Sequence, residues 1–229
     1  MVAPRRRRIQ GALKRVLDPV LGLALLVVLS PLLLGIAVWI LLETGRPVLF
    51  THPRAGKDGK PFPMFKFRTM VQEAIELGRK LHLSEDPFGV LADDPRITRS
   101  GRFLRRTGLD ELPQLVNVLR GEMSLVGPRP DLIEQAANYT EADRRRLAVL
   151  PGITGWAQVN GREEIPWPER FEQDAWYIEH WSLLLDAKIL LKTVAQPFRG
   201  QPSPVEDTMN IERAKAQEGK KAELARPQR

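Results

Sequence analysis

Asp110 and Glu111 form an adjacent acidic pair in a strongly basic part of the chain. Five arginines come shortly before the pair: Arg96, Arg99, Arg102, Arg105 and Arg106. An isolated Asp-Glu pair is most often a helix N-cap followed by an acidic first turn. Beside guanidinium groups, which match phosphate oxygens, it could instead be a nucleophile with a metal-binding or proton-handling neighbour. The same arginines would also suit anionic lipid headgroups.

Lys66 is a second candidate phosphate ligand, in the alternating stretch FKFRTM. The alternation predicts a strand over 64–70 with Lys66 and Arg68 on the same face. Two cations side by side would suit a phosphate. Long basic side chains at a membrane interface would give the same pattern.

Arg129 and Arg162 are cations in rigid or glycine-rich surroundings. Arg129 stands between two prolines, whose fixed φ limits the direction of the side chain. Arg162 ends the segment 151–162, which we expect to be a loop with too little apolar content for a core. Its glycines could let backbone N–H groups approach a phosphate. The chain contains neither GxxxxGK[ST] nor GxGxxG, so the common nucleotide-binding folds are not indicated.

The elements that would hold these residues are mostly helices. The apolar spacing predicts a helix over 110–119, with Asp110 near its N-cap and Pro113 in its first turn. Further helices are expected over 71–81, 131–139, 140–149 and 167–198, and a short extended piece over 48–51. In the last of these helices, aromatic side chains would anchor the domain at a membrane interface, namely Trp176, Tyr177 and Trp181. The predicted fold class is mainly α with a few short strands.

The run from Val20 to Leu42 has no charged residue, and its 23 residues are enough to cross a bilayer. A signal peptide is a poor interpretation, because the run is too long and no small-residue cleavage site follows it. The run therefore predicts a membrane helix.

Two features argue against a simple span. Ser30-Pro31 lies in the middle of the run, where proline cannot donate a hydrogen bond to the carbonyl of Val27. Both flanks are basic, whereas a span normally has one less basic side. A hairpin that dips into the membrane and returns fits both features. A bent but continuous helix is also feasible, since the Ser30 hydroxyl could bond the carbonyl that Pro31 leaves unpaired.

Composition limits the class of protein further. The 229 residues suggest a membrane segment over 1–45, one further domain over 46–200 and a polar tail over 201–229 that is disordered or a loosely held helix. There is no cysteine, so disulfides and thiolate metal sites are excluded. A net charge of +7 indicates an anionic partner, such as nucleic acid, lipid headgroups or a phosphorylated substrate.

Four stretches, in this order, resemble the bacterial sugar transferase family: LDPVLGLALLVVLSPLLL, FKFRTM, DPRITRSGRFLRRTGLDELPQLVNVLRGEMSLVGPRP and PGITGWAQVNGR. These are the monotopic polyprenyl-phosphate phosphoglycosyl transferases. The likeness runs from about Lys14 to about Phe198. It is to the small form of the family, which has the catalytic domain alone.

The resemblance implies an N-terminal re-entrant membrane helix hairpin, broken at Ser30 and Pro31, with an interfacial catalytic domain. It implies Asp110 as nucleophile and Glu111 as its partner, with Mg²⁺ at the pair. Phosphate-binding cations fall at the matching place in each motif, on Lys66, Arg105, Arg129 and Arg162.

The resemblance also implies an activity and a location. The chain would transfer a sugar-1-phosphate from a UDP-sugar to polyprenyl (undecaprenyl) phosphate and release UMP, through a covalent aspartyl intermediate. This would be the first membrane step of surface glycoconjugate or exopolysaccharide synthesis, on the cytoplasmic face of the bacterial inner membrane. Membrane lipids are expected partners, and nucleic acid is not.

Several points stay open at this level: the sugar, the pathway, the prenyl length, a homo-oligomeric state, and the division of roles between Asp110 and Glu111. The rival interpretation is a membrane-tethered basic module that binds anionic lipid or nucleic acid without catalysis. That interpretation gives no reason for the acidic pair.

Overall fold

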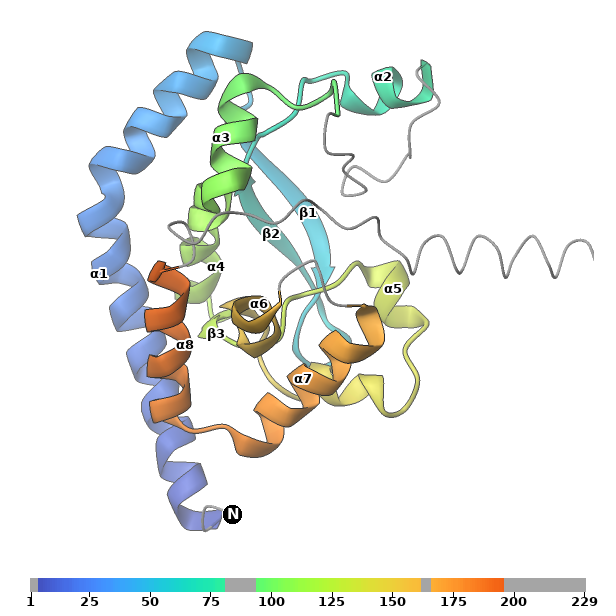
Figure 1. The fold of residues 1–229 in the computed structure, drawn as a ribbon. Coiled ribbons are helices and arrows are strands. Elements are labelled where there is room, and N and C mark those ends of the chain that lie inside the picture. The colour runs from blue at the N-terminus through green and yellow to red at the C-terminus, as the bar shows by residue number, and fades with distance from the viewer. Residues whose placement is uncertain (1–3, 81–93, 162–165, 196–229) are drawn as a thin grey trace, which may run out of the picture.

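The computed structural model describes residues 4–80, 94–161 and 166–195 (Figure 1). The described chain is mainly helical with a few short strands, as predicted. The helices are α1 (Pro4–Thr44), α2 (Ala74–Lys80), α3 (Arg99–Thr107), α4 (Leu115–Leu119), α5 (Ile133–Ala137), α6 (Trp156–Asn160), α7 (Trp167–His180) and α8 (Leu183–Ala195). The strands are β1 (Leu49–Ala55), β2 (Pro61–Phe67), β3 (Ser124–Val126) and β4 (Gly152–Thr154), and 3-10 helices cover η1 (Lys57–Gly59), η2 (Leu109–Gln114) and η3 (Asp143–Ala148).

The apolar run lies within α1, a single helix of 41 residues that is bowed along one side of the domain (Figure 1). The chain stays helical through Ser30 and Pro31 and does not reverse there, so the break expected for a hairpin is not seen. The Ser30 hydroxyl explains this, because it donates to the carbonyl oxygen of Val27 at 2.8 Å. It replaces the hydrogen bond that Pro31 cannot make.

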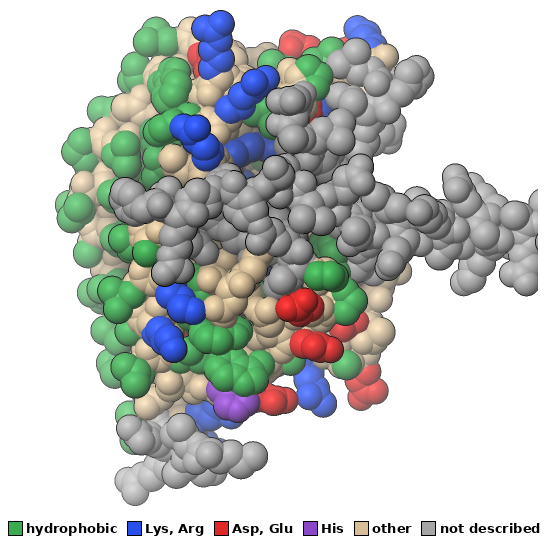
Figure 2. Space-filling model, in the orientation of Figure 1, with side chains coloured by type: hydrophobic (Ala, Val, Ile, Leu, Met, Phe, Trp, Pro, Cys, Tyr) green, Lys and Arg blue, Asp and Glu red, His purple; other side chains and the backbone are tan. Residues whose placement is uncertain are grey.

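Contacts hold α1 against the domain along much of its length. Leu26 packs on the main core, and Ile36 and Ile40 are buried in a second apolar cluster. Near the middle, Gly22 faces Val118 of α4, and an added Cβ would lie in van der Waals contact with it at 3.4 Å. The outer face of α1 is exposed and apolar, and its hydrophobic side chains line one edge of the molecule (Figure 2).

The strands form two separate pairs. β1 and β2 make an antiparallel hairpin in which Phe50 pairs with Lys66, while β3 and β4 are parallel. The predicted strand over 64–70 begins earlier, at Pro61, and ends at Phe67. Prolines at 61 and 63 are tolerated because each strand of a two-stranded sheet has an edge that needs no N–H donor.

The expectation of a loop over 151–162 is wrong for the described part of that segment, which contains β4 and α6. Its glycines allow backbone to pack on backbone: a Cβ at Gly152 would lie 2.0 Å from the Gly127 nitrogen, and one at Gly155 would lie 2.2 Å from the Gly127 oxygen. The N–H of Gly152 donates to the carbonyl of Pro128 at 2.9 Å. It is therefore used inside the fold rather than presented to a phosphate.

The predicted helix over 167–198 is divided into α7 and α8 at Trp181 and Ser182. Tyr177 was expected at a membrane interface, but its side chain is buried in the main core and its hydroxyl donates to Asp186 at 2.7 Å. The indole N–H of Trp181 donates to the same carboxylate at 3.0 Å. Trp176 keeps an exposed ring.

The other expected helices are shorter than predicted. α2 and α5 lie within the predicted 71–81 and 131–139, and 140–149 holds the 3-10 helix η3. α3 was not predicted as a helix. It begins after Thr98, whose hydroxyl accepts the N–H of Gly101 at 2.9 Å. The predicted tail over 201–229 lies outside the described residues.

Candidate active site

Asp110 and Glu111 lie in the first turn of η2, directly after the glycine that ends α3. Gly108 adopts φ +73°, which lets the chain leave α3 and start η2 without a loop. The N-cap position belongs to Gly108, and no side chain caps η2. Asp110 therefore does not cap η2, although it does lie in the expected acidic first turn. The residue is only 8% exposed, and this burial needs another explanation.

Glu111 forms ion pairs with two of the predicted cations. Lys66, on β2, places Nζ 2.9 Å from Glu111 Oε1. Arg129 makes a two-point contact with the same carboxylate, at 2.7 Å from Nη2 to Oε1 and 3.1 Å from Nη1 to Oε2. Residues far apart in the sequence thus meet in one ion-paired group, and the Arg129 side chain keeps 39% of its surface exposed.

Asn117 of α4 fixes β2 beside η2. Its side-chain oxygen accepts the N–H of Phe65 at 3.1 Å, and its amide donates to the carbonyl of Pro63 at 2.7 Å. Both bonds are made just before Lys66 on the strand. They set the position from which the lysine reaches Glu111.

Arg129 is held by contacts to its backbone. Arg146 is buried, and its Nη2 donates to the carbonyl oxygen of Arg129 at 3.0 Å. The same guanidinium pairs with Asp131 and, at 2.8 Å, with Asp174. Sequence reasoning missed this network, because nothing in the local pattern separates buried charges from a solvated charged helix.

Arg105 and Arg162 complete the predicted set of cations. The Nε of Arg105 donates to the hydroxyl of Thr69 at 2.8 Å, and its charge acts on the Asp110 carboxyl. Arg162 lies outside the described residues. The structure thus brings together Asp110, Glu111, Lys66, Arg105 and Arg129.

The two carboxyl groups have opposite electrostatic environments. Burial raises the pKa of Asp110 well above its usual range, and the neighbouring Glu111 charge adds to this, against the opposing pull of Lys66, Arg105 and Arg129. Burial also opposes ionisation of Glu111, but the charges and hydrogen bonds of Arg129 and Lys66 outweigh it and hold its pKa far below the usual range. Adjacent groups whose pKa values are pushed apart are typical of divided catalytic roles.

The sequence profile of the bacterial sugar transferase family matches residues 9–200, which is most of the chain. The chain belongs to this family. It is an enzyme of the transferase class.

Curated relatives of this sugar transferase agree with that assignment. The sugar transferase EpsL of Bacillus subtilis is 46% identical over 182 residues, covering 80% of this chain and 85% of EpsL. The undecaprenyl-phosphate galactose phosphotransferase of Salmonella typhimurium is 42% identical over 202 residues, 84% of this chain but 42% of that protein. The UDP-glucose:undecaprenyl-phosphate glucose-1-phosphate transferase of Escherichia coli is 43% identical over 194 residues, 81% of this chain and 40% of that protein. The chain therefore spans most of the smaller relative and about two-fifths of the larger ones.

The sugar transferase offers Mg²⁺ few protein ligands. Within the described ranges, no group of three or more His, Cys, Asp or Glu side chains could hold a metal ion. Mg²⁺ is usually bound by one or two carboxylates together with substrate phosphates and water. The pair at 110 and 111 fits that pattern, with Asp110 as the carboxylate that no described cation hydrogen-bonds.

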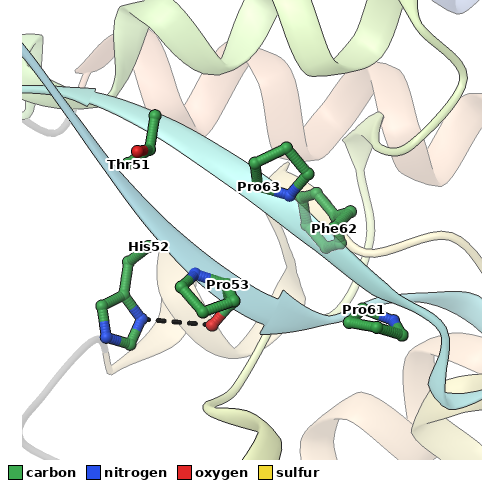
Figure 3. Close-up of a pocket in the computed structure, with 6 residues that line it drawn as sticks. All are labelled: Thr51, His52, Pro53, Pro61, Phe62 and Pro63. Carbon is green, nitrogen blue, oxygen red and sulfur yellow. Dashed lines mark hydrogen bonds between the residues drawn. The ribbon is translucent and has the colours of Figure 1, made fainter.

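A pocket of about 240 Å³ lies elsewhere, on the β1–β2 hairpin (Figure 3). It is lined by Thr51, His52, Pro53, Pro61, Phe62 and Pro63. None of these is Asp, Glu, Lys or Arg. The pocket therefore lacks the charges that phosphoryl transfer needs, and the acidic pair remains the candidate site.

Proposed function

We propose that this sugar transferase moves a sugar-1-phosphate from a UDP-sugar to polyprenyl (undecaprenyl) phosphate, with Asp110 as the nucleophile. One observation carries the proposal. Glu111 is ion-paired with Lys66 and Arg129, while the adjacent Asp110 carboxylate, in the described part of the chain, accepts no hydrogen bond from a cation. The site therefore presents one carboxylate for attack beside cations that another carboxylate holds in place.

In the first step, an Asp110 oxygen attacks the phosphorus that carries the sugar. The bond from that phosphorus to the bridging oxygen breaks, and UMP leaves with that oxygen. In the second step, an oxygen of the polyprenyl phosphate attacks the same phosphorus, and the bond to Asp110 breaks. The carboxylate is regenerated, and polyprenyl-diphosphate-sugar is the product. Both steps exchange one phosphate ester or anhydride for another, so neither needs a net proton transfer.

The cations stabilise charge on the phosphoryl oxygens, which is the dominant requirement in phosphoryl transfer. Lys66, Arg105 and Arg129 come from β2, α3 and the turn after β3, so they can approach a phosphoryl group from different sides. Arg162 is proposed as a further phosphate ligand from its place in the motif. Glu111 holds Lys66 and Arg129, so its proposed role is to orient cations.

Asp110 and Glu111 would hold Mg²⁺ together with the phosphates of the donor. The ion would offset negative charge on those phosphates when bound. Because Lys66 and Arg129 occupy Glu111, Asp110 is the better candidate ligand.

The names of the relatives support the substrates. The Escherichia coli relative is named for transfer of glucose-1-phosphate from UDP-glucose to undecaprenyl phosphate. Mass balance makes UMP the second product of any such transfer. The Salmonella relative is named for galactose with the same lipid phosphate. The lipid acceptor is therefore the firmer part of the proposal, and the sugar is the part that a screen must decide.

The contacts of α1 support a monotopic position, and the basic flanks of its apolar run favour the cytoplasmic face of the bacterial inner membrane. Near its start, Lys14 binds Asp186 of α8 at 2.6 Å, and at its end Glu43 binds the first turn of α3. Both ends of the helix thus attach to one domain, which argues that both lie on the same side of the bilayer. The exposed apolar face would then enter a single leaflet, with α1 lying along the membrane interface rather than crossing the bilayer.

An exposed apolar side of α8 extends the proposed lipid-facing surface. Its exposed side chains are Leu184, Leu191 and Val194. Figure 1 shows α8 on the same side of the domain as α1. This arrangement supports an interfacial catalytic domain whose site meets the lipid phosphate at headgroup depth.

The test is a screen of the purified protein in lipid nanodiscs against UDP-sugars, with Mg²⁺ and undecaprenyl phosphate. Release of UMP together with a new lipid-linked sugar would support the proposal. If no UDP-sugar gave UMP while the protein bound anionic vesicles, the non-catalytic basic module would be the better interpretation.

A further inference from the structure

The end of α1 packs against the elements that carry the candidate active site. A buried apolar cluster joins the helix to these neighbours and consists of Ile36, Ile40, Phe67 and Leu104, with Leu109 packed against it. Two of its members are chain neighbours of site residues, since Phe67 follows Lys66 and Leu104 precedes Arg105. Leu109, which packs against the cluster, precedes Asp110. Because packed interiors transmit displacement, a shift of this part of α1 would move the site.

Glu43, one residue before the end of α1, caps α3. Its Oε1 accepts the backbone N–H of Arg99 at 2.8 Å, and its Oε2 accepts that of Ser100 at 3.0 Å. First-turn N–H groups have no partner within their own helix, and a carboxylate there also complements the helix dipole. The carboxylate thus fixes the start of the helix that carries Arg105.

Arg68 makes the corresponding contact from the end of β2. Its Nη2 lies 3.0 Å from the carbonyl oxygen of Thr44, 2.6 Å from the Thr44 hydroxyl and 2.7 Å from the carbonyl oxygen of Gly45. These carbonyls end α1 and have no partner within it. Among the described residues, all hydrogen bonds of this buried guanidinium go to the end of α1. Arg68 therefore ties the strand that carries Lys66 to the membrane helix.

Thr69 connects the two attachments. Its hydroxyl accepts a hydrogen bond from the Nε–H of Arg105. Its carbonyl oxygen lies so close to Gly101 that a Cβ added to that glycine would be 2.0 Å from the oxygen. The segment after β2 is therefore enclosed between the end of α1 and the first turn of α3. Its position depends on both helices.

We propose that the last turn of α1 is a positioning element of the catalytic site, with Glu43 and Arg68 as its positioning residues. They hold α3 and β2 so that Arg105 and Lys66 face the reacting phosphoryl group. The membrane helix is then part of the catalytic scaffold as well as an anchor. This inference rests on the proposed function for the role of the two cations, while the attachment itself is a property of the fold.

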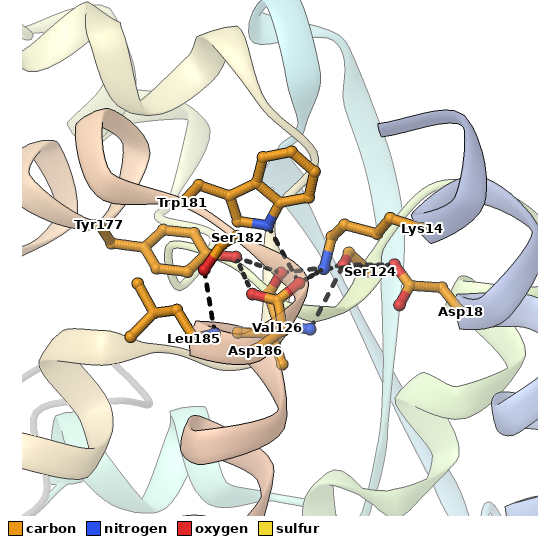
Figure 4. Close-up of polar contacts among 9 residues, drawn as sticks. All are labelled: Lys14, Asp18, Ser124, Val126, Tyr177, Trp181, Ser182, Leu185 and Asp186. Atoms are coloured by element: carbon orange, nitrogen blue, oxygen red, sulfur yellow. Dashed lines mark hydrogen bonds and ion pairs between the residues drawn. The ribbon is translucent and has the colours of Figure 1, made fainter. Parts of the chain in front are cut away.

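The test compares Glu43→Ala and Arg68→Met with Lys14→Met, in the full chain in nanodiscs. Lys14 attaches the opposite end of α1 through the polar network around Asp186 (Figure 4), so its variant loosens the helix away from the site. We expect kcat for UMP release to fall by about tenfold to 10²-fold in the first two variants, since small misplacements have effects of that size. The donor KM should change less. Glu43→Gln and Arg68→Lys should retain part of the activity.

A distance measurement tests the attachment without activity. The chain has no cysteine, so Cys residues introduced at the exposed Leu42 and at Arg102 of α3 can carry a pair of spin labels. Glu43→Ala should broaden the distance distribution between them, and Lys14→Met should not. An unchanged distribution, or a wild-type kcat in both positioning variants, would overturn the inference. The inference would also be overturned if Lys14→Met lost as much kcat as Glu43→Ala and Arg68→Met while losing the same amount of stability. If the wild type released no UMP from any donor, the proposed function would fail, while the distances would still decide the attachment.

Discussion

Arg146 donates a hydrogen bond from Nη2 to the backbone carbonyl of Arg129, at 3.0 Å, and so connects a buried ionic network to the candidate active site. The guanidinium also binds Asp131 and Asp174 and lies 4.4 Å from the centre of the Phe171 ring. The network fixes the turn after β3, from which Arg129 reaches Glu111. The buried Arg146 network thus sets the position of the Arg129 side chain, which reaches the surface.

Arg146→Met should destabilise the protein by about 3–5 kcal/mol, because it leaves two buried carboxylates without their cation. Thermal or denaturant unfolding would measure the loss. Glu141, an exposed acid just before η3, provides a control in Glu141→Ala, which should change stability far less. A loss below 1 kcal/mol in Arg146→Met would contradict the role assigned to the network.

The attack of Asp110 on the UDP-sugar should be lost on acidification at a higher pH than it would be for an aspartate with an ordinary pKa. Asp110 must be ionised to attack, and burial raises the pKa of its carboxyl, so activity is lost as the pH falls through that raised value. The pH profile of kcat/KM for UMP release would show this limb. Its absence down to pH 4 would argue against Asp110 as the nucleophile.

Glu111→Gln should move the same acid limb to lower pH. The substitution removes a negative charge that contributes to the raised pKa of Asp110. It also releases Lys66 and Arg129 from Glu111, and their charges lower that pKa. Activity should fall by about 10²-fold, because both cations lose the group that orients them. A limb that stayed in place would mean that Glu111 does not set the electrostatics of Asp110.

The candidate site was largely predictable, because its residues belong to short motifs with one chemistry. Asp110, Glu111, Lys66, Arg105 and Arg129 do come together. Taken singly, the acidic pair and Lys66 had simpler explanations, and it was the order of the motifs that selected the set. The residues that position them were not predictable. Asn117 and Arg146 act through contacts that join distant parts of the chain, and local sequence carries no signal for such contacts.

The fold was predictable in class but not in detail. The glycines at 152 and 155 suggested a loop, yet they serve close packing against Gly127, which depends on a partner far away in the sequence. Tyr177 looked like an interface residue because its neighbours are amphipathic, but Asp186 gives its hydroxyl a buried partner. Tertiary contacts decided both cases.

Both ends of α1 should face the cytoplasm. Single cysteines at Gly11 and at Asp58 can be labelled without background, since the chain has no cysteine. A side chain built at Gly11 meets no atom within 4 Å, so the substitution should be tolerated. A membrane-impermeant maleimide should label both positions in inside-out vesicles and neither in intact spheroplasts. Labelling of either one from the periplasmic side would exclude the monotopic arrangement.

Asp110→Asn should abolish the reaction at its first step. Asparagine keeps the size and much of the hydrogen bonding of aspartate, so the fold should persist, but its amide cannot attack phosphorus. Turnover should fall on the order of 10³-fold or more, as for the loss of other catalytic nucleophiles. Covalent labelling is the decisive measurement for the nucleophile.

The wild type, given Mg²⁺ and a UDP-sugar labelled in the sugar but no acceptor, should release UMP and retain sugar phosphate at Asp110. The Asn variant should retain none, while Glu111→Gln should still be labelled, though slowly. Because the two steps are separate displacements, steady-state kinetics with both substrates should be ping-pong. If the label were found on Glu111, the roles of the two carboxylates would have to be exchanged. If no label formed in the wild type and the kinetics required both substrates to be bound together, the transfer would be direct and Asp110 would not be its nucleophile.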